Sequence, residues 1–528
     1  MTYCLSKQNV LLKIAGRTFS IGLLPLLNVE PVLSAERIKF NYGLLEESIP
    51  ISSLETYAKT GKVDDNLTAY RRYIGQNELT QLRTALTTPI PLTQVEVSQF
   101  LYTPIGERLL ERLGKVIQTE SRLSGFYAIR AALILSAAEP KNFTLLNVLR
   151  KFPTKAISIN LNESLAIVNT LQNAVNQTQN AVALINQQAQ KELTTDSAPN
   201  LVVTDLGKPG SFRFFKQTIT LNDISRNRNF PADIYLPVSQ TPRPIIVISH
   251  GLGSDRTSFA YLAEHLASYG YVVAVPEHPG SNSKQLQALL AGIADRVTNP
   301  REFIDRPLDI KFLLDELTRL SKSNPTFQGR LNLEQIGVVG QSFGGYTALA
   351  LAGAEINFEQ LTANCPALED TLNISLLLQC LAVNLPTTQY NLSDARIKAA
   401  IAINPVDSGI FGQAGLSQIK IPLMIVSGSA DTVAPALPEQ IQPFTWLTTP
   451  NKYLALINGG THFSTIAESA DAVVPVPTPI IGSSPALARR YVKALSVPFF
   501  QTYVTQQSSY LPYLSTDYVN TISQQPLP

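Results

Sequence analysis

The sequence predicts an α/β fold, with a mostly parallel sheet flanked by helices, preceded by an all-helical domain. Beyond residue 200, short continuous apolar runs such as 245–248 and 423–426 alternate with helical patterns. Such runs are typical of strands that are buried on both faces of a parallel sheet. Before residue 200, apolar side chains recur every three or four positions, most clearly over residues 161–185, as they do in amphipathic helices.

A change of composition divides the chain in two. Residues 194–210, rich in proline, glycine and small polar side chains, have the character of a linker. We therefore expect a helical domain over 36–200 and a catalytic domain over 201–528. The helical domain carries no catalytic motif. Its last stretch fits a coiled-coil-like arm or, as we expect, a long helix packed on the second domain.

Residues 1–35 have the pattern of a secretory signal peptide. Basic residues precede a short apolar run at 19–27, and small residues precede the charged Glu36. The pattern predicts export to the periplasm or the exterior. The alternatives are a retained membrane anchor, or a buried first helix in a cytoplasmic protein.

Charge excludes one class of partner. The 528 residues carry a formal net charge of +2 without a cluster of lysine and arginine, which argues against nucleic acid. We expect no cofactor and no metal site. The oligomeric state is not evident from the sequence.

Ser342 lies in a turn that is typical of a nucleophile. The segment Gly340–Gly345 reads Gly-Gln-Ser-Phe-Gly-Gly, directly after the apolar run 336–339 and before a helical stretch at 346–352. A strand, a sharp glycine-rich turn around a serine and a helix form the nucleophile elbow of an α/β-hydrolase fold. The alternative is an ordinary tight turn.

A serine nucleophile needs a base and an acid, and the chain has only 4 histidines. His462 follows the last predicted strand, where the base of this fold is found. Two aspartates compete for the acid that orients it. Asp431 follows the strand at 423–426 and is favoured, and Asp407, which follows the preceding strand, is the alternative.

The other histidines are expected to be structural. His250, in the segment Ser249–Ser254, follows a strand and should hold a glycine-rich loop. His278 should do the same in its own loop, and a contact with the substrate is the alternative for it. That glycine-rich loop lets a backbone N–H point at the nucleophile. We expect the oxyanion hole to combine the N–H groups of Leu252 and Phe343.

These motifs resemble a known family. The segments His250–Thr257, Val275–His278 and Gly340–Gly345 are similar to platelet-activating-factor acetylhydrolases and to the related dienelactone-hydrolase-like esterases. The likeness covers about residues 205–465. The whole arrangement also resembles cyanobacterial hydrolases with an extra N-terminal helical domain of unassigned role.

The resemblance implies a calcium-independent serine esterase that acts on lipid or other acyl esters. Ser342, His462 and the backbones of Leu252 and Phe343 carry over position by position. The acid of acetylhydrolases lies nearer Asp407, so this chain departs from the family if Asp431 takes the role.

An insertion at about 355–393 is expected to cap the acyl pocket. It holds Cys365 and Cys380, which would pin the cap if bridged; two buried free thiols are the alternative. Its leucines, Leu376–Leu378, favour an apolar acyl group, unless the insertion is a purely structural excursion.

Together these features predict a serine hydrolase that cleaves carboxylic esters, with a small-molecule or lipid ester as its substrate. Acyl transfer to an alcohol is an alternative reaction on the same site. A catalytically silent fold used for binding is the alternative of a different class. Peripheral membrane contact through the helical domain is a separate hypothesis.

Overall fold

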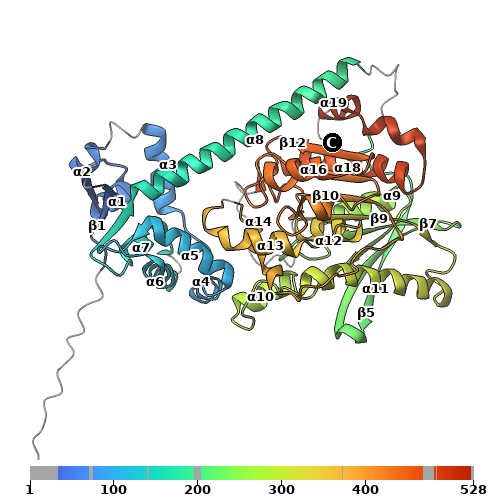
Figure 1. The fold of residues 1–528 in the computed structure, drawn as a ribbon, viewed down its shortest axis with the longest axis horizontal. Coiled ribbons are helices and arrows are strands. Elements are labelled where there is room, and N and C mark those ends of the chain that lie inside the picture. Colours follow the sequence, from blue (N-terminus) through green and yellow to red (C-terminus); the bar gives the residue numbers. More distant parts are fainter. Residues whose placement is uncertain are drawn as a thin grey trace, which may run out of the picture.

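The computed structural model describes residues 34–43, 45–70, 75–139, 142–195, 204–371, 373–467, 481–482 and 484–524. The predicted signal peptide therefore lies outside the described residues, except for its last two positions. The predicted linker lies partly outside them. Figure 1 shows an N-terminal part and a larger C-terminal part, joined by one long helix, α8 (Leu161–Thr195).

The C-terminal part is built on an 8-stranded sheet with the order β12-β11-β10-β9-β7-β8-β6-β5. From β8 to β12 all neighbours are parallel, whereas β6 pairs antiparallel with both β5 and β8. The strands are β5 (Phe214–Asp223), β6 (Arg228–Pro237), β7 (Arg243–Ser249), β8 (Val272–Pro276), β9 (Leu331–Gln341), β10 (Ile397–Ile403), β11 (Leu423–Gly428) and β12 (Lys452–Ile457). The predicted α/β fold with a mostly parallel sheet is confirmed.

Continuous apolar strands occur here because both faces of the sheet are covered. In β7, Ile245 and Val247 join the core on one face, and Ile246 and Ile248 join the core on the other. The first face is covered by α11 (Glu302–Ser323) and α12 (Phe343–Leu351), and the second by α9 (Ala260–Ser268) and α18 (Pro485–Tyr503). Alternate side chains of a strand therefore all find apolar partners.

The N-terminal part is not all-helical, so that expectation is wrong. It contains a 4-stranded sheet in the order β2-β1-β4-β3. Its strands are β1 (Arg37–Tyr42), β2 (Leu45–Pro50), β3 (Ile117–Gln118) and β4 (Ala156–Asn160). The sequence hid them because β1 and β4 have only 6 and 5 residues, and they pair in parallel across the whole length of this part, Ile38 opposite Ile157.

Helices complete the N-terminal part and touch the sheet domain. They are α1 (Ile51–Thr60), α2 (Asp65–Thr68), α3 (Gln76–Thr87), α4 (Gln94–Leu101), α5 (Pro104–Val116), α6 (Phe126–Ala137) and α7 (Leu145–Arg150). α4 packs against α10 (Ser283–Leu290), and Arg112 of α5 donates a hydrogen bond to the backbone oxygen of Leu368. The N-terminal part therefore contacts the second domain at two places besides α8.

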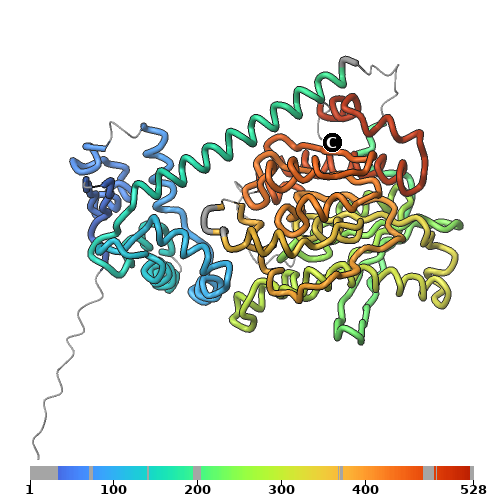
Figure 2. Tube along the Cα trace, in the orientation of Figure 1, coloured from blue at the N-terminus to red at the C-terminus, as the bar shows by residue number. Residues whose placement is uncertain are grey.

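The helix α8 spans 35 residues without a glycine or a proline. It contacts β1 and α5 near its start, and η5 (Leu437–Ile441) and α19 (Thr516–Gln524) farther along. Figure 2 shows the C-terminal segment of the chain returning to lie beside its far end. Leu165, Val168 and Leu171 on its first half are exposed. The helix thus bridges the two parts, and none of its described side chains is buried.

The predicted cap insertion folds into short helical turns: α13 (Phe358–Asn364), η3 (Cys365–Asp370), α14 (Ser375–Gln379) and η4 (Cys380–Asn384). Cys365 and Cys380 are joined by a disulfide, which decides between the two alternatives for these residues. The remaining short elements are η2 (Ile224–Arg226), α15 (Gly412–Leu416), α16 (Gln442–Trp446) and η6 (Ser508–Leu514). Among the described helices, none has the length and apolar character needed to cross a membrane.

The disulfide should stabilise the folded state measurably. It closes a loop with a sequence separation of 15, and in the chain-entropy model a loop of that size contributes about 3 kcal/mol. We expect the Cys365→Ser/Cys380→Ser double variant to lower the free energy of unfolding by about 2–3 kcal/mol, measured by urea denaturation. Reductant should destabilise the wild type equally and leave the variant unchanged. Equal stability of variant and wild type would contradict this expectation.

Candidate active site

The turn between β9 and α12 holds Ser342 in a strained backbone conformation, with φ 57° and ψ −117°. Glycines make the turn possible. A Cβ on Gly340 would lie 1.8 Å from the backbone oxygen of Gly344, and one on Gly344 would lie 2.0 Å from the backbone oxygen of Ser249. Only residues without a side chain fit at these two positions, so the turn has the geometry of a nucleophile elbow.

Three side chains predicted from the sequence meet at the carboxyl ends of three parallel strands, β9, β11 and β12. The Nε2 atom of His462 lies 2.9 Å from Oγ of Ser342, and its Nδ1 atom lies 2.7 Å from Oδ2 of Asp431. Asp431 follows β11 and His462 follows β12. A carboxylate only accepts hydrogen bonds, so Nδ1 carries the proton and Nε2 is free to accept from the serine hydroxyl.

The carboxylate of Asp431 is fixed by its own loop. Its Oδ1 atom accepts hydrogen bonds from the backbone N–H groups of Val433 and Ala434, both at 2.8 Å. These bonds fix the orientation of the carboxylate and leave Oδ2 for the imidazole. Asp431 is therefore held ready to orient His462.

Asp407, the alternative acid, does not reach His462. It is fully buried, and neither of its carboxyl oxygens has a hydrogen-bond partner in the described chain. Burial raises the pKa of Asp407 well above its usual value, and the nearby Glu439 carboxylate raises it further. A neutral carboxyl with no contact to the imidazole cannot orient it.

Two amide side chains, which the sequence interpretation missed, tie the loops of the site together. Gln341, next to the serine, donates to the backbone oxygen of His462 at 3.1 Å. Asn404 donates to the backbone oxygen of Thr461 at 3.2 Å and accepts from the N–H of Gly428 at 2.9 Å. The available signal was a polar residue at the carboxyl end of an apolar strand, Gln341 at the end of β9 and Asn404 directly after β10.

The predicted oxyanion groups lie on two segments that touch. A Cβ on Gly251 would lie 3.4 Å from Cβ of Ser342, so the turn that carries Leu252 abuts the serine. Phe343 is the first residue of α12, and the first N–H groups of a helix have no acceptor within it. The Phe343 N–H thus lies next to Ser342 at the positive end of the α12 dipole, and the turn that carries Leu252 lies against the same serine.

His250 and His278 hold this turn, as expected of structural histidines. Nδ1 of His250 lies 2.8 Å from the backbone oxygen of Gly251 and therefore donates, and its Nε2 accepts from the N–H of His278 at 3.1 Å. Burial, followed by the charge of Arg306, lowers the pKa of His250 to about 4. The neutral ring with one proton on Nδ1 fits both contacts.

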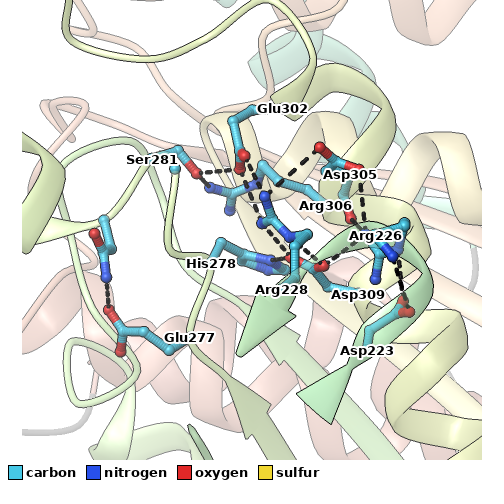
Figure 3. Close-up of polar contacts among 12 residues, drawn as sticks. Asp223, Arg226, Arg228, Glu277, His278, Ser281, Glu302, Asp305, Arg306 and Asp309 are labelled. Atoms are coloured by element: carbon cyan, nitrogen blue, oxygen red, sulfur yellow. Dashed lines mark hydrogen bonds and ion pairs between the residues drawn. The ribbon is translucent and has the colours of Figure 1, made fainter. Parts of the chain in front are cut away.

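A buried network of ions lies behind the turn, and the sequence interpretation missed it as well. Arg226 and Arg228 meet the carboxylates of Asp309 and Glu302 on α11, with the closest contact at 2.6 Å (Figure 3). Arg306 lies among them. The signal was a run of charged side chains at helical spacing, Glu302, Asp305, Arg306 and Asp309, in the first half of the helix that precedes the serine strand.

Two stretches of the chain match known families. Residues 34–160, within the N-terminal part, match a family described as alpha/beta hydrolase of unknown function (DUF1400). This match is consistent with the α/β-hydrolase fold of the C-terminal part. Residues 221–297 match platelet-activating factor acetylhydrolase, isoform II, and include the turn that carries Leu252. The resemblance to acetylhydrolases expected from the motifs is confirmed.

Buried histidines should make the protein less stable in acid. Burial lowers the pKa of both His250 and His265 to about 4, below the 6.5 of an unperturbed imidazole. Below pH 6.5 the unfolded chain takes up protons that the folded chain does not, so stability is complete above pH 6.5 and falls as the pH falls toward 4. Each of the two histidines should lower the free energy of unfolding by about 2 kcal/mol between pH 7 and pH 5.

His265 allows a clean test because it lies away from Ser342 and contacts the backbone oxygen of Leu206 at 2.9 Å. Glutamine at position 265 keeps a donor for that oxygen without titrating. We expect His265→Gln to lose less stability than the wild type between pH 7 and pH 5, measured by urea denaturation. Identical losses would show that His265 does not contribute.

Proposed function

We propose that the protein is a serine esterase that hydrolyses carboxylic esters of lipids or other acyl compounds through an acyl-enzyme on Ser342. The observation that carries the proposal is the hydrogen-bonded chain from Ser342 through His462 to Asp431, with contacts of 2.9 and 2.7 Å. A serine, a base within hydrogen-bond distance and an acid that orients the base are what nucleophilic acyl transfer requires.

In the first half of the reaction, Nε2 of His462 takes the hydroxyl proton of Ser342 as Oγ attacks the ester carbonyl carbon. The carbonyl oxygen becomes negatively charged and accepts hydrogen bonds from the N–H groups of Leu252 and Phe343. His462 then gives its proton to the leaving alkoxide. The carbon–oxygen bond of the ester breaks, and the acyl group stays on Oγ.

In the second half, His462 takes a proton from water, and the resulting hydroxide attacks the acyl-enzyme. The same N–H groups stabilise the second oxyanion, and the proton returns to Oγ as the carboxylic acid leaves. Asp431 keeps Nδ1 protonated throughout and stabilises the imidazolium that forms in each half.

Two observations support lipid or other acyl esters as the substrate class. One is the match of residues 221–297 to platelet-activating factor acetylhydrolase, isoform II. The other is the position of the cap, since the N–H of Ser375 at the start of α14 donates to the backbone oxygen of Val433, two residues from Asp431. The leucine-containing cap therefore contacts the loop that carries Asp431, which supports an apolar acyl group as part of the substrate.

We also propose that the protein works outside the reducing cytoplasm. The Cys365–Cys380 disulfide supports this, because disulfides persist in oxidising compartments such as the periplasm and the cell exterior.

Esterase activity should depend on Ser342. We expect the wild type to hydrolyse p-nitrophenyl esters from acetate to palmitate, and Ser342→Ala to lower kcat by about a thousandfold or more, because the attacking oxygen is lost. Melting temperatures of the two proteins should agree within a few degrees. A wild type as inert as Ser342→Ala on every ester would exclude the proposed function.

The two aspartates should respond differently to the same substitution. Asp431→Asn should lower kcat by about a thousandfold, because an amide stabilises the wrong tautomer of His462. Asp407→Asn should change kcat less than about threefold, since one neutral group replaces another away from His462. Steady-state kinetics on p-nitrophenyl acetate gives both values. The reverse ranking would assign the acid role to Asp407.

A further inference from the structure

One buried cation touches both segments that carry the proposed oxyanion donors. The side chain of Arg306 is completely buried. One of its terminal nitrogens, Nη2, donates to the backbone oxygen of His250 and, at 3.2 Å, to Oγ of Ser249. Its Nε atom donates to Oγ1 of Thr347 on α12 at 3.1 Å. The first contacts fix the turn before Leu252, and the last fixes the helix that begins with Phe343.

The guanidinium also lies against the first residue of α12. Its central carbon is 4.7 Å from the centre of the Phe343 ring, a cation–π contact. Burial lowers the pKa of Arg306 to about 9, while Glu302 and Asp309 act to raise it. The guanidinium is therefore charged at neutral pH, which strengthens its hydrogen bonds to neutral acceptors in this dry environment.

Two serines connect Arg306 to the carboxylates that balance its charge, and Figure 3 shows the connection through Ser281. Oγ of Ser281 accepts from Nη1 of Arg306 at 2.7 Å and donates to Glu302 at 3.1 Å. Oγ of Ser249 accepts from Arg306 and donates to Nε2 of His278 at 3.0 Å. His278 in turn donates from Nδ1 to Asp309 at 3.0 Å. Only the second path runs through the strand end that leads into the oxyanion turn.

The turn needs such support because of its own composition. Gly251 separates the His250 peptide from Leu252, and glycine leaves the backbone free to rotate. An oxyanion donor is effective only when its N–H lies about 2.7–3.1 Å from the oxygen that becomes charged. A rotation at Gly251 would turn the Leu252 N–H away from that oxygen. The Leu252 peptide is held by the His250 ring, which donates to the Gly251 oxygen, and Arg306 in turn holds the backbone oxygen of His250.

We propose that Arg306 is a positioning residue for the oxyanion hole, acting through the His250 carbonyl and the Ser249 hydroxyl on one side and through Thr347 on the other. The inference rests on the proposed function and deepens it, since it states how the two N–H donors on separate segments keep a common orientation. Arg306 does not touch the substrate. Its contribution is to kcat rather than to substrate binding.

The chain offers a matched pair of variants. Ser249→Ala and Ser281→Ala each remove one buried hydroxyl that accepts from Arg306. The Ser249 hydroxyl lies at the strand end that leads into the oxyanion turn, whereas Ser281 meets the turn through its backbone oxygen, which accepts from the N–H of Gly253 at 2.8 Å and is unchanged by the substitution. Arg306→Lys keeps a positive charge without the forked set of donors. The probe is a fluorophosphonate, in which Oγ of Ser342 displaces fluoride from phosphorus while the phosphoryl oxygen occupies the oxyanion position. Labelling of Ser342 is followed by mass spectrometry, beside kinetics on p-nitrophenyl acetate.

We expect Ser249→Ala and Arg306→Lys to slow labelling and lower kcat by about tenfold or more, a fraction of the loss on removing a donor outright. KM should stay within twofold, and Ser281→Ala should stay within threefold of the wild type in every value. If Arg306→Lys does not fold, the two serine variants still decide the question.

The possible results are distinct. Equal labelling rates for Ser249→Ala and Ser281→Ala would show that the network has only a structural role. Losses of kcat in both variants that parallel their losses in melting temperature would show the same, and either result would overturn the inference. A wild type that is labelled on Ser342 while all variants react at its rate would also overturn it and leave the proposed function intact. A wild type that neither reacts with the fluorophosphonate nor hydrolyses esters would overturn both the proposed function and this inference.

Discussion

The start of α12 and the end of β7 approach each other so closely that no side chain fits between their backbones. A Cβ on Gly344 would lie within 2.0 Å of the Ser249 oxygen, and that contact joins the start of α12 to the end of β7. The strained φ of Ser342 is tolerated because the sheet, the helix and this contact fix it together. The serine, the two oxyanion segments and the base loop all take their positions from this junction.

Around this junction the protein buries charged side chains at positions where apolar side chains would avoid the cost of desolvation. Arg228, Glu302 and Asp309 lie behind the oxyanion turn, with ion pairs as short as 2.6 Å. Buried ion pairs commonly add little net stability, because desolvation offsets their attraction. Their directionality is the physical gain, since hydrogen bonds hold a peptide at a defined angle and apolar contacts do not. The apolar contacts of the core thus supply most of its stability, and the buried ion pairs fix the orientation of the peptides that they contact.

The sequence was most informative where the chemistry is local. The alternation of apolar strands and helices, the turn at Ser342 and the position of His462 each appear within a few residues, so the fold and the partners of the serine could be inferred. Short strands such as β1 and β4 could not be, since they pair across the entire N-terminal part. Arg306 was overlooked for the same reason, because its partners come from other segments. The choice between Asp431 and Asp407 needed the burial and the contacts of both side chains.

The long helix α8 has a consequence for how the length of this chain can change. A loop between two domains absorbs an added residue by bending, but a continuous helix advances by about 1.5 Å and turns by about 100° for each one. α8 contacts both parts, and α4 and α5 meet the second domain as well. An insertion or deletion of one residue in α8 would therefore rotate one body against the other and break those contacts. Insertions or deletions close to a whole number of helical turns would keep the relative orientation of the two parts. The distance between the two parts can therefore change only in steps of about one turn, or about 5.4 Å.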